Sequence, residues 1–152
     1  MMHAQVQSIR LTDFNYNPDY VPTEEVPITY QLQALNRVPE DGETLEITVG
    51  IRYLEPDSAN FLLSATCRTV YKMMGMTRLK HPETGRPVVD VAEVLLQQLS
   101  VEAVAHARAL VAAHTAGTWF EQYHVSLGGA LESLIKVPPL EAEAPNKHPE
   151  TE

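Results

Sequence analysis

Alternating apolar and polar residues fill the first half of the chain and predict β-strands. The clearest alternation covers residues 45–53, where every second side chain is apolar and most of the others are polar. Residues 28–34 alternate in the same way. Residues 5–14 alternate with one position out of phase, which predicts a slip or bulge near Ser8.

A fourth run, residues 61–73, has the same period, with Phe61 beginning its apolar face. Turn-forming clusters separate the last three runs, and short turns join antiparallel neighbours. The pattern therefore predicts a four-stranded antiparallel meander. Residues 74–89 carry Gly75, Gly85 and two prolines, and they are typical of a flexible exposed connection.

Helical periodicity replaces the alternation after this connection. Asp90 is placed to cap a helix, with Glu93 three residues later completing a capping box. The helix is alanine-rich, continues to about Thr115 either straight or with a kink at Ser100, and is expected to end with Gly117 at the position that favours a left-handed residue.

The last part of the chain has less to bury. A short apolar segment around residues 131–135 predicts a final helix, and residues 138–152 are proline-rich and acidic, as in a solvated tail. The sequence thus predicts an α+β fold. A single domain over residues 1–137 combines the sheet with the long helix and the short C-terminal helix packed on one face.

Composition and charge argue against some classes of function. The chain has 152 residues, is 44% hydrophobic and carries a formal net charge of -9. An acidic protein is a poor binder of nucleic acid and suits basic partners. One cysteine, Cys67, and the lack of a signal peptide or long apolar run indicate a reduced cytoplasmic setting without membrane insertion.

Candidate chemistry is sparse. His106 and His114 lie roughly 12 Å apart along one helix by its rise per residue, too far to share a metal ion. Glu102 and His106 are four residues apart, which more often gives a solvated pair than an acid–base pair. No nucleophile motif or phosphate-binding loop is present. We therefore expect no enzyme activity, metal or cofactor.

The order of elements resembles the SecB protein-export chaperone family. The resemblance in residues is concentrated in a few pairs and glycines: Phe61-Leu62, Gly75, Ala107-Arg108 and Gly117-Thr118. It implies an ATP-independent holdase, a dimer or tetramer, that binds unfolded or precursor polypeptides and serves protein export. The translocation motor ATPase would then be a partner.

The resemblance also implies two surfaces. A client-binding groove would be lined by aromatic and apolar residues: Tyr16, Tyr20, Trp119, Phe120, Tyr123 and Leu127. From the residues alone, the same aromatics fit a core equally well. The alanine-rich helix would pack between subunits through small residues and one arginine: Ala105, Arg108, Ala109, Ala112 and Ala113.

Three alternatives stay open at the level of sequence. The least favoured is an enzyme with an α+β pocket, because it requires a buried acid–base pair that the sequence does not reveal. A SecB-like chaperone can serve a toxin–antitoxin system, with an antitoxin as its partner. A structural protein can use the same sheet and helix as an oligomer-forming unit without binding clients.

Overall fold

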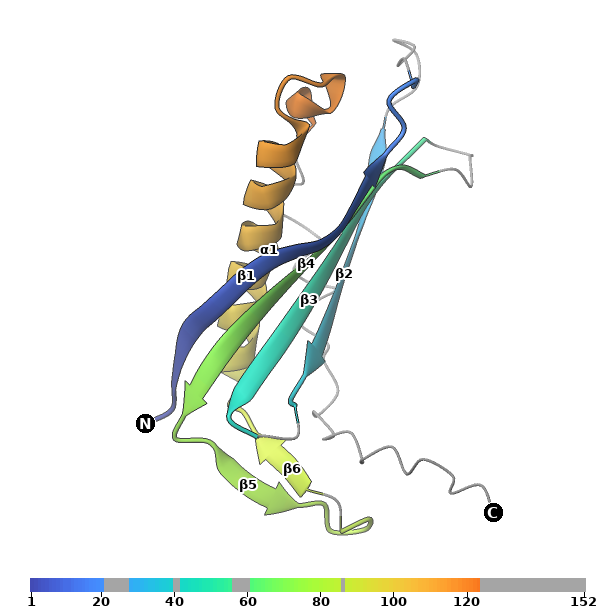
Figure 1. Cartoon of the computed structure of the whole chain (residues 1–152). Coiled ribbons are helices and arrows are strands. Elements are labelled where there is room, and N and C mark those ends of the chain that lie inside the picture. The colour runs from blue at the N-terminus through green and yellow to red at the C-terminus, as the bar shows by residue number, and fades with distance from the viewer. Residues whose placement is uncertain (21–27, 40–41, 56–60, 86, 124–152) are drawn as a thin grey trace, which may run out of the picture.

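The protein folds into a four-stranded antiparallel sheet with one long helix on one face (Figure 1). The computed structural model describes residues 1–20, 28–39, 42–55, 61–85 and 87–123. The sheet strands are β1 (His3–Tyr16), β2 (Thr29–Arg37), β3 (Thr44–Leu54) and β4 (Phe61–Met74). The remaining elements are β5 (Thr77–Lys80), β6 (Pro87–Asp90), the helix α1 (Glu93–Thr115) and the 3-10 turn η1 (Trp119–Gln122). The predicted α+β class is confirmed.

The strand order is β1-β4-β3-β2, with antiparallel neighbours throughout. The predicted meander is correct for β2, β3 and β4. It is wrong for β1, which pairs with β4 at the far edge of the sheet. Twelve residues, 17–28, separate β1 from β2, whereas only six separate each of the later pairs of consecutive strands in this sheet, and short connections favour adjacent antiparallel strands.

Register shifts in the strand pairing change the sheet face to which side chains of β1 and β4 point. The predicted slip in β1 is confirmed by a register shift between Val6 and Ser8. β1 has a second shift between Leu11 and Asp13, and a third lies between Tyr53 and Leu54, opposite the start of β4. It turns Phe61 away from the core, where 49% of the residue is exposed, so the prediction of a buried Phe61 is wrong.

Residues 74–89 include a hairpin that the sequence pattern did not predict. β5 pairs with β6 in a separate two-stranded sheet beyond the end of the main one (Figure 1). Gly75 makes the turn into it with φ +79°, and a Cβ there would lie 3.0 Å from the Met1 carbonyl oxygen. The glycine is thus needed both for its left-handed backbone and for this close approach.

The helix starts later than the capping box predicted. Asp90 ends β6 and pairs with Thr77, and the N-cap of α1 is Ala92, which makes no side-chain hydrogen bond. Pairing within the hairpin therefore takes precedence over capping. The C-terminal end is as predicted, because Ala116 is the C-cap and Gly117 has φ +79°. α1 continues through Ser100, whose hydroxyl donates to Leu96 O at 2.8 Å. The predicted final helix and tail lie outside the described residues.

The core lies between α1 and the sheet. The helix packs mainly on β3 and β4 and more lightly on β1. Its buried face is built from small and medium residues: Leu99, Ser100, Ala103, Val104, Ala107, Val111 and Thr115. The Tyr71 hydroxyl, on β4, donates to Leu99 O at 3.1 Å and joins the two layers. Small side chains at this face let the helix backbone approach the sheet closely.

Among the described residues, no helix combines the length and the apolarity that crossing a membrane requires.

Candidate functional site

An aromatic cluster lies where η1 meets the end of the sheet. The Trp119 and Phe120 rings stack with centroids 4.0 Å apart, and Tyr123 meets Trp119 edge-on at 5.3 Å. Tyr20, from the loop after β1, lies 5.1 Å from Trp119. Tyr16 meets Phe120 edge-on at 5.9 Å. The structure therefore brings together five of the six predicted client-groove residues, while Leu127 lies outside the described residues.

Local hydrogen bonds fix the geometry of η1. The Thr118 hydroxyl accepts from the Phe120 N–H at 3.2 Å, and the Gly117 N–H donates to Glu121 Oε2 at 3.0 Å. These bonds satisfy amide groups at the start of the turn. The turn is anchored to the sheet through the Tyr53 hydroxyl, which donates to Tyr123 O at 3.1 Å. The backbone of η1 is thus held against the sheet.

The members of the cluster differ in exposure. Phe120 is only 1% exposed and belongs to the core, so in this conformation it supports the cluster from beneath. Tyr16 is 38% exposed, and Trp119, Tyr20 and Tyr123 are half-buried. Trp119 Nε1 is buried, and no acceptor for it lies in the described part of the chain.

A groove of about 280 Å³ continues from the cluster along the flank of α1. Its lining comes from the helix, β3 and the end of η1: Tyr53, Ala105, Arg108, Ala109, Val111, Ala112 and Tyr123. The predicted client residue Tyr123 and four predicted interface residues therefore share one surface. Ala113, the fifth predicted interface residue, is exposed on the helix.

Tyr53 connects this groove to the core. Burial raises the pKa of the Tyr53 hydroxyl above its usual range, and the nearby Arg108 guanidinium acts in the opposite direction. At neutral pH the hydroxyl is therefore protonated and available as a donor. The sequence analysis did not select Tyr53 as a site residue, although its place on the regular apolar face of β3 was a usable signal.

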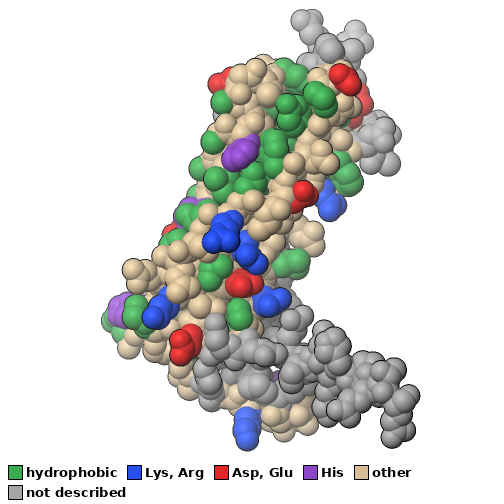
Figure 2. Space-filling model, viewed as in Figure 1, with side chains coloured by type: hydrophobic (Ala, Val, Ile, Leu, Met, Phe, Trp, Pro, Cys, Tyr) green, Lys and Arg blue, Asp and Glu red, His purple; other side chains and the backbone are tan. Residues whose placement is uncertain are grey.

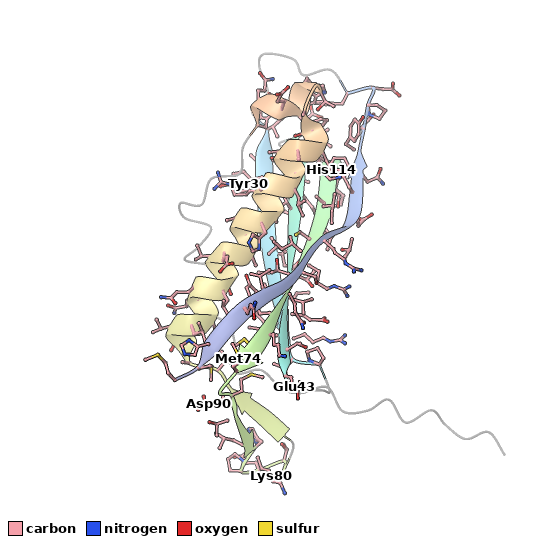
Figure 3. All side chains as sticks on the ribbon, turned by 60° about the vertical axis from the view of Figure 1, so that its left-hand side comes forward. Tyr30, Glu43, Met74, Lys80, Asp90 and His114 are labelled. Atoms are coloured by element: carbon pink, nitrogen blue, oxygen red, sulfur yellow. The ribbon has the colours of Figure 1, made fainter. Side chains whose placement is uncertain are left out.

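The helix leaves one side of the sheet less covered. Half-buried apolar residues of β2 face the helix layer: Tyr30, Leu32 and Ala34. Figure 3 shows Tyr30 and His114 on opposite sides of α1. His114 lies on the β1 side, where its ring is 5.4 Å from the ring of Phe14. The groove thus borders an apolar strip on the β2 side.

The Glu102–His106 pair has a structural environment. His106 Nε2 is 3.6 Å from Glu102 Oε1, and its Nδ1 is 3.2 Å from the hydroxyl of buried Thr69. The ring thus links α1 to β4, a contact that the helical spacing did not reveal. Cys67 is buried, which raises the pKa of its thiol and disfavours the reactive thiolate. Within the described residues, His, Cys, Asp and Glu do not gather in threes around a possible metal position.

Comparisons with known proteins support the fold. No protein-family model matches the chain, and a search of curated proteins finds no significant relative. The Mycobacterium tuberculosis Rv1957 SecB-like chaperone, solved in complex with a ChAD peptide from the Rv1956 HigA1 antitoxin, is similar in structure. The TM-score is 0.54 at 11% identity, over 82% of this chain and 88% of that one. A protein of unknown function from Streptococcus agalactiae gives a TM-score of 0.41 at 13% identity, over 84% and 98% of the two chains.

The first of these similarities defines the fold of the chain as SecB-like. At this level of identity it establishes the architecture, and the function has to be argued from the surfaces described above.

Proposed function

We propose that the protein is an ATP-independent chaperone of the SecB-like type that holds non-native polypeptides. The observation that carries the proposal is the aromatic cluster, which opens into a groove along α1. Half-buried Tyr20, Trp119 and Tyr123 present ring faces and edges beside a chain of alanines. Such a surface binds extended apolar segments with little sequence preference, because ring contacts tolerate many side chains.

The polar groups of the site fit a backbone as well as side chains. Arg108 lines the groove and offers guanidinium donors. An extended polypeptide brings carbonyl oxygens at regular intervals. A polypeptide client therefore satisfies donors that a purely apolar ligand would leave unpaired.

We further propose that a second copy of the chain packs on the exposed alanine side of α1. Ala105, Ala109 and Ala112 form a smooth surface on which another backbone can approach closely, and Arg108 sits among them. The resulting dimer or tetramer would work in the cytoplasm. Because the groove includes both Tyr123 and these alanines, client binding and assembly are expected to be coupled.

Two kinds of client fit the proposal. The first kind is a precursor protein destined for export, which the chaperone would pass to the motor ATPase. An antitoxin segment is the other, and it is favoured by one specific observation: the structurally similar SecB-like chaperone was solved with an antitoxin peptide. Co-expression with candidate clients, followed by co-purification of either class, distinguishes the two.

The proposal is tested by suppression of aggregation. We expect the unmodified chain to keep a chemically unfolded protein in solution without ATP, and Trp119→Ser with Tyr123→Ser to abolish this activity. Leu35→Ser is the matched control, since Leu35 is 60% exposed on β2 and its side chain faces away from the helix. Full activity in the folded double variant would contradict the proposal, as would equal loss in the control.

A further inference from the structure

The sheet face opposite α1 carries a charge that the overall composition hides. Alternation along the strands directs basic side chains to this face: Arg10, Arg37, Arg52, Arg68 and Lys72. The acidic residues on it are Asp13 and Glu46. Figure 2 looks onto this face, where Lys and Arg side chains lie across the middle of the molecule. A protein with a formal net charge of -9 thus has a predominantly basic face.

Two arginines, one on the edge strand β1 and one on its neighbour β4, oppose each other directly. Arg10 on β1 is the cross-strand partner of Arg68 on β4. Like charges in such positions repel, and neither arginine has an ion pair within the described part of the chain. Arg37, by contrast, has Glu46 at 3.9 Å. The Arg10–Arg68 pair disfavours folding slightly and is suited to hold an anionic group between two guanidinium groups.

A shallow hollow of about 160 Å³ lies further across the same face, and one of its lining residues, Thr48 on β3, is the cross-strand partner of Arg68. Gly50 at the middle of β3 leaves room that a side chain would otherwise fill. The rim is made mainly of amides, hydroxyls and a guanidinium: Gln31, Gln33, Thr48, Arg52 and Thr66, with Leu35 at one side. Groups of this kind donate to and accept from a peptide backbone. The hollow is therefore suited to an extended chain lying across the strands.

We propose that this face, here named the arginine face, binds an acidic polypeptide segment of a partner protein. A carboxylate would lie between Arg10 and Arg68, and the neighbouring backbone would lie over the Gly50 hollow. Charge complementarity carries the assignment, because Arg10 and Arg68 lie side by side on this face and have no ion pair among the described residues. The site lies on the opposite side of the sheet from α1, so it is separate from the proposed client groove.

Nucleic acid is the other polyanion that such a face suggests, and the observations favour a polypeptide. The overall charge of -9 repels a densely charged backbone, and Asp13 and Glu46 interrupt the basic surface. An acidic peptide carries fewer charges at wider spacing, and its backbone can use the amides and hydroxyls around Gly50.

The test is fluorescence anisotropy with the full chain and a labelled peptide of alternating Glu and Ala. We expect saturable binding that weakens as salt rises from 50 to 300 mM, and no binding of a matched Lys–Ala peptide. Arg68→Gln should weaken binding about fivefold, and Arg10→Gln with Arg68→Gln at least tenfold, as expected for loss of exposed ion pairs. Circular dichroism should show both variants folded.

The control variant removes one positive charge at a position outside the arginine face. Lys80 is exposed on β5, away from the arginine face, so Lys80→Gln should change binding less than twofold. The variant with Trp119→Ser and Tyr123→Ser should bind the acidic peptide normally, which separates this site from the client groove. The proposal is overturned if the acidic peptide does not bind, if Lys80→Gln acts as strongly as Arg68→Gln, or if a single-stranded oligonucleotide binds more tightly than the peptide.

Discussion

Enlarging an alanine of α1 should destabilise the protein much more on the face that packs on the sheet than on the opposite face of the helix. Ala107 is 1% exposed and faces the sheet, whereas Ala109, two positions further along, is exposed in the groove. Successive helical residues are rotated by about 100°, so these positions lie on nearly opposite sides. Substitution of each by leucine adds the same three carbon atoms to two different environments.

The cost at Ala107 follows from its surroundings. The side chain is closed in by the sheet, and inserting extra methylenes into a filled core costs about 1–3 kcal/mol. At Ala109 the added atoms enter an open groove, and the difference in helix propensity is only about 0.2 kcal/mol. The free energy of unfolding should therefore fall by about 2 kcal/mol for Ala107→Leu and by less than about 0.5 kcal/mol for Ala109→Leu.

Urea unfolding followed by circular dichroism and by Trp119 emission measures both values, since Trp119 is the only tryptophan in the chain. With an m-value of about 2 kcal/mol per M, Ala107→Leu should lower the midpoint by roughly 1 M. Size-exclusion chromatography with light scattering on the same variants measures self-association. Ala109→Leu should alter it if a second copy packs at Ala109. Equal midpoints for the two variants would refute the placement of Ala107 in the core.

Three further predictions concern charge and burial. Arg10→Glu creates an attractive cross-strand pair with Arg68, so the free energy of unfolding should rise by about 0.5 kcal/mol at low salt. A lower free energy of unfolding for Arg10→Glu, measured by urea denaturation, would contradict the pairing of residue 10 with Arg68. Cys67 is buried and the pKa of its thiol is raised, so a thiol reagent should modify it much more slowly in the folded protein than in urea; equal rates would show that it is accessible. Burial also raises the pKa of Tyr71 well above the usual value of 10.0. The unfolded chain then loses this proton first, so stability should fall as pH rises above about 10, and more gradually in Tyr71→Phe; identical pH profiles would exclude Tyr71 as a cause.

The periodicity of the sequence predicted the strands and the helix more reliably than it predicted which strands pair with each other. The strands, the slip near Ser8 and the glycine end of α1 follow from local patterns that tertiary contacts do not oppose. The position of β1 depends on where a long connection leads, and no local pattern encodes this. The hairpin of β5 and β6 was missed because its strands are short and flanked by prolines and glycines, which are typical of loops.

The candidate site was only partly visible in the sequence. The aromatics after Gly117 are close in sequence, and Tyr16, at the end of β1, and Tyr20, after it, could be added to them through the resemblance. Phe120 shows what the sequence left open, because it is a core residue that supports its exposed neighbours. The arginine face could not be predicted, since the opposition of Arg10 and Arg68 depends on the pairing of β1 with β4.

The account rests on the claim that the protein assembles and holds unfolded chains. Size-exclusion chromatography with light scattering, with and without an unfolded polypeptide, tests this most directly. We predict a mass that is a multiple of the 16.9 kDa chain, a complex of higher mass with the polypeptide, and a change in Trp119 emission on its formation. A monomer whose mass and emission do not respond to the polypeptide would contradict the account.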